Sequence, residues 1–181
     1  FQAEEEFWLK DYSLYRALRE KMSFSPWFTW EEGLANRKEE KLAHYEEVLS
    51  DRMEYHSFLQ YLFHLQWERL KKYSNENGIF LMGDLPIYLA PDSCDTWSYP
   101  ELFFLDESGS PNKLAGVPPD YFSKEGQLWG NPIYNWQRHE EQGYTWWIER
   151  IKHSLTRFDY LRLDHFRGFE SFWEIPKDAL S

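Results

Sequence analysis

Residues 158–164, FDYLRLD, read as an apolar strand that ends on a carboxylate, and they indicate the architecture more clearly than any other stretch. Residues 78–84, GIFLMGD, repeat the same pattern. Runs of this kind are typical of strands that are buried on both faces of a parallel sheet and end at its solvent-facing rim. The sequence therefore predicts two parallel strands, each ending on an aspartate.

Helical periodicity precedes each of these runs. The expected helices cover residues 3–22, 37–49, 55–73 and 143–157. Acidic residues open the first helix and basic residues close it, as the helix dipole favours, and Asn77-Gly78 is the natural stop of the third. The apolar faces of the last two helices are expected at Phe58, Leu62, Leu65 and Leu70, and at Trp146, Trp147, Ile148, Ile151 and Leu155.

Between the two predicted strands lies a long segment that is rich in turn signals. Residues 85–135 hold most of the prolines and many glycines, with turns expected at residues 106–109 and 116–119. We expect a loop-rich excursion without a regular helix. Excursions of this length inside a compact domain tend to be functional.

The order helix, strand, long loop, helix, strand favours a (β/α) barrel. Such a barrel needs eight units and ~250 residues, whereas this chain of 181 residues offers two or three units. We therefore predict an α/β fold, a partial (β/α)8 TIM barrel with long βα loops. Because the chain starts at Phe1 without an initiator Met and stops just inside what reads as a helix, we expect a fragment truncated at both ends.

Charge and cysteine content exclude several classes of partner. The chain has 31 acidic and 20 basic residues, a formal net charge of -11, and its basic residues are scattered, so we expect neither nucleic acid nor an anionic membrane. No apolar run approaches the ~20 residues that cross a bilayer. The single cysteine, Cys94, indicates a reducing compartment, so we expect a cytoplasmic protein, or a plastid one in a plant or alga.

Aromatic residues are unusually frequent, with 10 Trp, 12 Tyr and 14 Phe making 20% of the chain. Flat amphipathic rings suit sugars, because a pyranose has an apolar C–H face and a rim of hydroxyls. Most rings in any protein nevertheless serve packing. The excess favours a carbohydrate ligand without establishing one.

The end of the second predicted strand carries the residues most suited to chemistry. Period-2 alternation puts Arg162 and Asp164 side by side on one face, where the guanidinium would keep the carboxylate ionised, as a retaining glycosidase nucleophile requires. The same pair is also what a structural salt bridge looks like. Two roles are also open for Asp84. It either lines the site or accepts hydrogen bonds from the loop amides of residues 85–88.

Metal and phosphate sites are not indicated by the spacing. His139-Glu140-Glu141 lacks the second histidine of a zinc-protease motif, residues 92–95 lack the glycine and final glutamate of a calcium loop, and no glycine-rich phosphate cradle is present. We expect no metal and no cofactor.

Several long motifs resemble those of the 4-α-glucanotransferase (amylomaltase) family. LRLDHFRGF, at residues 161–169, is similar to the family's nucleophile motif. The other similar segments are GDLPIYLAPDS (83–93), AGVPPDYFSKEGQLWGNPIY (115–134), GYTWWIER (143–150) and FWEIP (172–176). The resemblance implies an inserted helical region over residues 1–54 and a barrel segment over residues 55–181.

The resemblance also implies roles for single residues. Asp164 looks like the catalytic nucleophile, Arg162 like the cation that orients it and His165 like a donor to the sugar beside the scissile bond. The residues that look like glucan contacts, most of them in a flexible loop, are Asp120, Tyr121, Phe122, Gln127 and Trp129. For Tyr121 and Trp129 the alternative is a lid on the core.

A retaining mechanism needs a second carboxylic acid ~5 Å from the nucleophile. In the family that glutamate lies on a later strand, which the resemblance would put past Ser181, and Glu170 and Glu174 sit in the loop after the nucleophile strand. We therefore expect the parent protein to be a hexosyltransferase that acts on α-1,4-glucans. The 181-residue fragment is expected to be inactive on its own. The alternatives are an α-amylase-like hydrolase and a non-catalytic glucan-binding protein.

Overall fold

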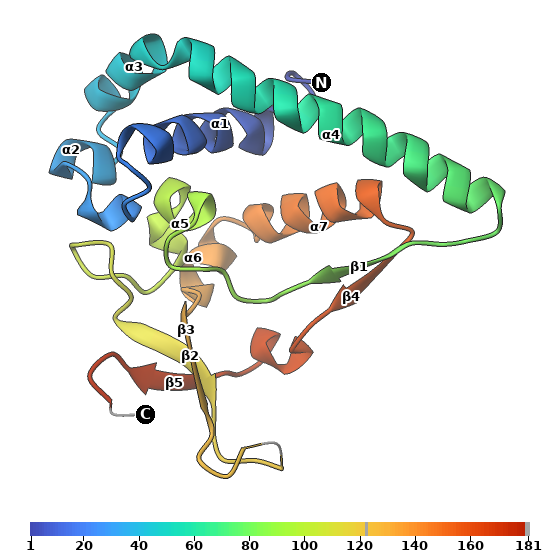
Figure 1. Cartoon of the computed structure of the whole chain (residues 1–181). Coiled ribbons are helices and arrows are strands. Elements are labelled where there is room, and N and C mark those ends of the chain that lie inside the picture. Colours follow the sequence, from blue (N-terminus) through green and yellow to red (C-terminus); the bar gives the residue numbers. More distant parts are fainter. Residues whose placement is uncertain (122, 180–181) are drawn as a thin grey trace. The chain divides into compact units, whose positions relative to one another are not determined.

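The computed structural model describes residues 1–121 and 123–179, and the fold is mixed α/β (Figure 1). The chain divides into two compact units. The first unit consists of Phe1–Gly83 and Trp147–Arg162, and the second of Asp84–Trp146 and Leu163–Ser181. The three divisions fall inside strand β1 (Met82–Leu85), helix α7 (Thr145–Arg157) and strand β4 (Tyr160–Leu163).

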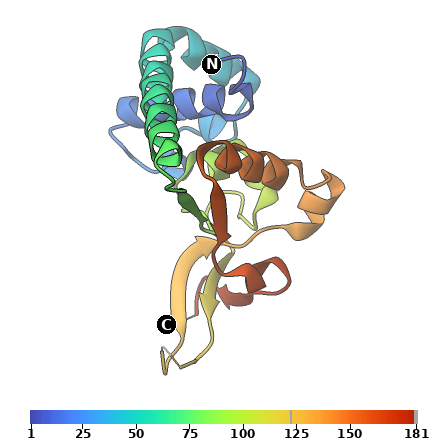
Figure 2. The same cartoon turned by 90° about the vertical axis from the view of Figure 1, so that its right-hand side faces the viewer.

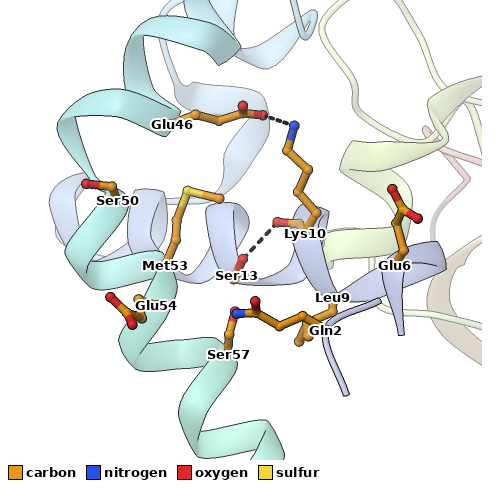
Figure 3. Close-up of a pocket in the computed structure, with 10 residues that line it drawn as sticks. All are labelled: Gln2, Glu6, Leu9, Lys10, Ser13, Glu46, Ser50, Met53, Glu54 and Ser57. Atoms are coloured by element: carbon orange, nitrogen blue, oxygen red, sulfur yellow. Dashed lines mark hydrogen bonds and ion pairs between the residues drawn. The ribbon is translucent and has the colours of Figure 1, made fainter. Parts of the chain in front are cut away.

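Helices make up most of the first unit. They are α1 (Glu6–Lys21), η1 (Trp27–Thr29), α2 (Glu32–Ala35), α3 (Glu39–Val48), α4 (Ser50–Glu76) and most of α7 (Thr145–Arg157). α1 packs against α4, and Leu9, Leu14 and Leu18 of α1 are buried. A cavity beside this contact is lined mainly by polar side chains, from α1, α3, α4 and Gln2 (Figure 3).

The four helices expected from periodicity are confirmed, but their apolar faces are only partly right. α4 begins five residues earlier than expected, at Ser50, and its C-cap is Asn77, followed by Gly78 with φ 74°. Phe58 and Leu70 are 52% and 49% exposed. Large apolar residues occur all round α4, so no single stripe could be buried against one neighbour.

α7 shows the same partial agreement. Trp146 and Trp147 are buried, as expected. Ile148 and Leu155 are 45% and 49% exposed, so the expected apolar face is only half buried. Periodicity gives the direction of a face, whereas the depth of burial depends on what packs against it.

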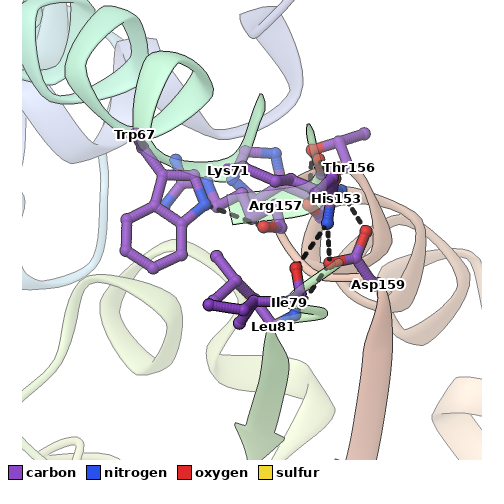
Figure 4. A network of polar contacts seen from close by, with 9 residues as sticks. Trp67, Lys71, Ile79, Leu81, His153, Thr156, Arg157 and Asp159 are labelled. Carbon is purple, nitrogen blue, oxygen red and sulfur yellow. Dashed lines mark hydrogen bonds and ion pairs between the residues drawn. The ribbon is translucent and has the colours of Figure 1, made fainter. Parts of the chain in front are cut away.

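A polar network ties α4 to the strands of the first unit (Figure 4). The Asp159 carboxylate accepts hydrogen bonds from the Leu81 N–H at 2.8 Å and from the Asn75 amide at 2.9 Å. The Leu81 N–H and the Asn75 amide hold the pKa of Asp159 below its usual range. The Trp67 indole donates to the Arg157 carbonyl at 2.7 Å. These bonds fix the starts of β1 and β4.

β1 and β4 form a two-stranded sheet. The Asp159 N–H donates to the Leu81 carbonyl at 2.9 Å, and five residues later the Asp164 N–H donates to the Leu85 carbonyl at 3.2 Å. The two strands therefore run in the same direction, as the sequence predicted. A Cβ on Gly83 would lie 2.3 Å from the Phe158 ring, so this close approach requires glycine.

The expectation that these strands are buried on both faces is wrong. Ile79, Phe80 and Met82 are 58%, 60% and 67% exposed, and in β1 only Gly83 and Leu85 are buried. Within the described residues β1 has β4 as its one paired strand, so a face that a larger sheet would cover stays open.

The second unit contains an antiparallel sheet that the sequence did not predict. Its strands are β2 (Lys113–Val117), β3 (Gln127–Pro132) and β5 (Trp173–Pro176), in the order β3-β2-β5. Figure 2 shows β2 and β3, in yellow and light orange, running side by side to the loop that joins them. The short helices of this unit are α5 (Cys94–Ser98), η2 (Pro100–Leu102), α6 (Trp136–Glu141) and η3 (Phe166–Phe169).

Residues 85–135 are thus less irregular than expected. Gly116 and Val117 belong to β2, so the turn expected at residues 116–119 is misplaced. The turn at residues 106–109 is confirmed, with the Gly109 N–H donating to the Asp106 carbonyl at 2.9 Å. Hydrogen bonds from Ser108 lower the pKa of the Asp106 carboxyl to about 2.

Aromatic rings form the core of the second unit. Tyr134 lies 5.1 Å from Phe103, 5.4 Å from His139 and 6.0 Å from Trp146, measured between ring centroids. His139 is 1% exposed, and burial lowers its pKa to about 4. Part of the aromatic excess therefore serves packing.

Candidate active site

Two aspartates lie at the carboxyl ends of neighbouring parallel strands in the second unit. Asp84 is in β1, immediately before Leu85, and Asp164 follows the last residue of β4. The Asp164 N–H donates to the Leu85 carbonyl, so Asp84 and Asp164 lie at the same edge of the sheet. Both aspartates are exposed. In α/β folds this edge is where ligands bind.

Arg162 is the third residue of β4 and is exposed, like Asp164 two positions later. Leu161 and Leu163, which alternate with them along the strand, are less exposed, so β4 has the predicted period-2 alternation. Arg162 belongs to the first unit and Asp164 to the second, so the unit boundary passes between these residues.

His165 turns the chain sharply after the strand. Its backbone is left-handed, with φ 46° and ψ 47°, and leads directly into η3. Its ring lies 5.1 Å from the Trp129 ring in an edge-on arrangement and 6.1 Å from the Tyr88 ring. A left-handed backbone is uncommon outside glycine and is often found at functional sites. Ring contacts therefore hold His165 next to the predicted nucleophile.

Gly168 lets the loop after Asp164 lie close to residues 87–88. A Cβ at Gly168 would be 2.6 Å from Ile87 Cδ1 and 2.9 Å from His165 Cδ2. Real Cβ contacts are longer than this, so any other residue would displace the loop. Gly168 was missed because its role depends on neighbours that are distant in sequence.

Tyr88 is also missing from the sequence-predicted site. It is 8% exposed, and its hydroxyl has no hydrogen-bond partner in the part of the chain that the structure describes. Burial raises its pKa to about 12. Its ring contacts Trp129 at 5.9 Å and stacks on Tyr134 at 6.2 Å. Its place in the GDLPIYLAPDS motif is the signal that could have marked it.

β3 presents two of the predicted glucan contacts on one face. Gln127 and Trp129 are two residues apart, and the Trp129 indole donates to Gln127 Oε1 at 2.9 Å. Trp129 is 37% exposed, so it is not a buried lid on the core. Because its ring also contacts His165, the structure brings Trp129, Gln127 and His165 together.

The loop between β2 and β3 carries the remaining candidates. The Asp120 carboxylate accepts from the Ser123 N–H at 2.8 Å, and the Ser123 hydroxyl donates to the Gly126 carbonyl at 2.6 Å. Tyr121 is 99% exposed, so it does not pack on the core. Phe122, the third candidate in this loop, lies outside the described residues.

Searches of the described residues for other kinds of site gave negative results. Across residues 1–121 and 123–179, no group of three or more His, Cys, Asp or Glu side chains could hold a metal ion. Nor does any helix in those ranges have the length and apolar character needed to cross a membrane.

Exposed carboxylates at the carboxyl ends of neighbouring parallel strands are typical of the active sites of α/β enzymes. A family model described as 4-alpha-glucanotransferase matches residues 1–181, and this chain belongs to that family.

Individual relatives agree with the family assignment. The chain is 51% identical to a 4-alpha-glucanotransferase of Aquifex aeolicus over 97% of its length and 36% of that protein. It matches the structure of an amylomaltase from Streptococcus agalactiae in complex with acarbose with a TM-score of 0.92 and 46% identity, covering 98% of this chain and 36% of that one. The chain therefore spans about a third of the length of the relatives that it matches.

A more distant structure bears on the fold alone. The amylomaltase from Corynebacterium glutamicum matches with a TM-score of 0.72 and 21% identity, covering 94% of this chain and 22% of that one. The mixed α/β architecture is thus shared well beyond the range of close sequence similarity.

Proposed function

We propose that this chain is the nucleophile-bearing part of a 4-α-glucanotransferase, which moves a segment of an α-1,4-glucan onto another glucan or glucose. The supporting observation is the edge formed by β1 and β4, where Asp84 and Asp164 emerge together and His165 lies against Trp129. The amylomaltase of Streptococcus agalactiae, which binds acarbose, shares this fold and nearly half of this sequence.

The proposed reaction is a retaining double displacement at Asp164. Its carboxylate attacks the anomeric carbon while the glycosidic oxygen leaves with a proton, and a glycosyl ester forms on the aspartate. An acceptor hydroxyl then attacks the same carbon, gives its proton to the base and releases Asp164. Arg162, two residues earlier on β4, orients Asp164.

The acid that protonates the leaving oxygen lies outside these 181 residues. Glu174 is in β5, 2.6 Å from Lys113, and this ion pair occupies it. Glu170 follows η3 and is exposed. We therefore propose that the chain alone is inactive and that the reaction needs no cofactor.

The remaining candidates would bind the glucan. His165 would donate to the sugar beside the scissile bond, with Gln127 and Trp129 on the neighbouring sugars. Asp84 would line the same edge. Asp120, Tyr121 and Phe122 would close over the glucan and keep water from competing with the acceptor.

The architecture in this proposal is a partial (β/α)8 barrel. Residues 1–54 would form an inserted helical region and residues 55–181 the barrel segment. Support comes from the parallel pair β1 and β4, each of which follows a long helix, α4 or α7. A cytoplasmic location fits the single cysteine, Cys94, because a chain with one cysteine has no internal disulfide.

The test is product analysis with maltotriose and the full-length protein in which this chain lies. We expect glucose together with longer maltooligosaccharides from the wild type, and transfer at least about a thousandfold slower from Asp164→Asn. Glu170→Gln is the matched control, an exposed carboxylate nearby, and should stay within a few-fold of wild type.

Other outcomes would point elsewhere. Glucose and maltose without longer products would identify a hydrolase, and binding without turnover would identify a glucan-binding protein. Loss of activity in Glu170→Gln would make Glu170 the acid. Turnover by the purified 181-residue chain above a mock-purified control would refute the claim that the acid lies elsewhere.

A further inference from the structure

The Tyr88 hydroxyl is a buried polar group that has no hydrogen-bond partner among the described residues. The side chain as a whole is 8% exposed, and it lies beside the candidate active site, in contact with His165 and Trp129. Buried polar groups are normally paired, and phenylalanine would fill the same space without an unpaired oxygen. A hydroxyl kept here calls for a partner that it gains in another state of the protein.

Three rings contact the Tyr88 ring, and they belong to Tyr134, Trp129 and His165. The Tyr134 hydroxyl already donates to a backbone carbonyl at 2.5 Å, and the Trp129 indole to a glutamine side chain at 2.9 Å. An indole N–H cannot accept a hydrogen bond. The ring nitrogens of His165 make no hydrogen bond within the described residues, and a neutral imidazole has one nitrogen that accepts. His165 is therefore the neighbour best suited to pair with the Tyr88 hydroxyl.

Gly168 brings the two groups to one place. A Cβ built on this glycine would lie 2.9 Å from His165 Cδ2 and 3.5 Å from the Tyr88 hydroxyl oxygen. Because glycine has no side chain, nothing from this residue separates the hydroxyl from the imidazole. Burial raises the pKa of Tyr88 to about 12, so the hydroxyl keeps its proton and can donate to an imidazole nitrogen.

We propose that Tyr88 is a positioning residue that sets the tautomer of His165 when a glucan is bound. The Tyr88 hydroxyl donates to one ring nitrogen of His165, which leaves the ring proton on the other nitrogen. That second nitrogen then donates to the sugar beside the scissile bond. This role of Tyr88 rests on the proposed function, in which His165 contacts the sugar, and it decides which nitrogen of His165 carries the proton.

The first test is the kinetics of glucan transfer from maltotriose by the full-length protein in which this chain lies. Tyr88→Phe should lower kcat about three- to tenfold, the effect of one lost hydrogen bond, and should change KM less than twofold, because the buried hydroxyl does not touch the glucan. Tyr15→Phe is the matched control and should leave kcat and KM unchanged. It removes the hydroxyl of a similarly buried tyrosine of α1, in the other unit.

The same substitution in a His165→Asn background shows whether Tyr88 acts through His165. Asparagine tolerates the left-handed backbone of this position, and its amide has fixed donors and no tautomers. Tyr88→Phe should therefore change kcat less than twofold in that background. A loss of the same size in both backgrounds would mean a purely structural role and would overturn the proposal.

The second test reads the tautomer directly from the NMR chemical shifts of the two ring nitrogens of His165. The proteins carry Asp164→Asn, so that maltotriose binds without turnover, and the His165 signals are those that disappear in His165→Asn. With maltotriose bound, we expect one neutral tautomer when Tyr88 is present and a mixture of both in Tyr88→Phe. The same tautomer populations in the two proteins would overturn the proposal.

The two levels of the argument fail in different ways. A wild type that makes no longer maltooligosaccharides would refute the proposed function, and the role of Tyr88 with it. An active wild type together with full kcat in Tyr88→Phe would overturn the role of Tyr88 alone.

Discussion

Two buried tyrosines in the second unit differ in the surroundings of their hydroxyls. Tyr134 is 1% exposed and donates to the Ile87 carbonyl at 2.5 Å. The Tyr88 hydroxyl is equally hidden but has no partner among the described residues. Because the two rings stack on each other at 6.2 Å, Tyr→Phe at each position changes one oxygen in the same cluster.

The two substitutions should change stability in opposite directions. Tyr134→Phe removes a hydrogen bond and leaves the Ile87 carbonyl unpaired, which costs about 1–2 kcal/mol. At ~2–4 °C per kcal/mol for a chain of this size, Tm should fall by about 2–8 °C. Tyr88→Phe removes a hydroxyl that lost its water on folding without gaining a partner, so the free energy of unfolding should stay unchanged or rise by about 1 kcal/mol.

The assay is urea unfolding of the 181-residue chain at pH 7, followed by circular dichroism, with both variants measured beside the wild type. Since burial raises the pKa of Tyr88 to about 12, its hydroxyl is neutral throughout. If Tyr88→Phe lost as much stability as Tyr134→Phe, the Tyr88 hydroxyl would have a partner that the structure does not contain, and the argument would fail.

Three further predictions concern His139, Gly168 and Asp106. Burial lowers the pKa of His139 to about 4, whereas the pKa in the unfolded chain is near 6.5. The contribution of His139 to the free energy of unfolding is therefore complete above pH 6.5 and is lost as the pH falls to 4. Unfolding titrations should show about 3 kcal/mol of pH dependence, which His139→Gln should lack. Gly168→Ala should cost about 1–3 kcal/mol in urea unfolding, because its Cβ would lie 2.6 Å from Ile87 Cδ1. Hydrogen bonds from Ser108 lower the pKa of Asp106 to about 2. As the pH falls from 4 to 2, the free energy of unfolding of the wild type should therefore fall by about 1 kcal/mol relative to that of Asp106→Asn, after allowing for solvent screening.

The sequence predicted features that depend on local signals. The helices follow from periodicity and caps, and the strand ends at Asp84 and Asp164 follow from apolar runs that close on a carboxylate. The exposed faces of α4 and β1 could not be predicted, because burial depends on elements that are distant in sequence. The sheet β3-β2-β5 was missed for the same reason, since β5 pairs with a strand about 60 residues earlier.

The candidate site shows the same limit. Asp164 and His165 stand in a short motif and were predicted, whereas Tyr88 and Gly168 have roles that only their tertiary contacts define. The Trp129 to His165 contact joins residues 36 positions apart and has no local signal. A motif marks which residues belong to a site, and packing decides which of them support the others.

Residues 85–89 support the candidate site through alternate backbone carbonyls. The Leu85 carbonyl accepts from the Asp164 N–H at 3.2 Å, the Ile87 carbonyl from the Tyr134 hydroxyl at 2.5 Å, and the Leu89 carbonyl from the Asn131 amide at 2.8 Å. Three carbonyls of this short segment thus accept hydrogen bonds from three other parts of the second unit.

The side chain between these carbonyls, Tyr88, contacts the His165 and Trp129 rings. Residues 85–89 therefore hold the backbone of Asp164, the ring of His165 and the end of β3, which carries Trp129 two residues earlier. Substitutions that displace this segment should disturb Asp164, His165 and Trp129 together, even though none of the three is changed.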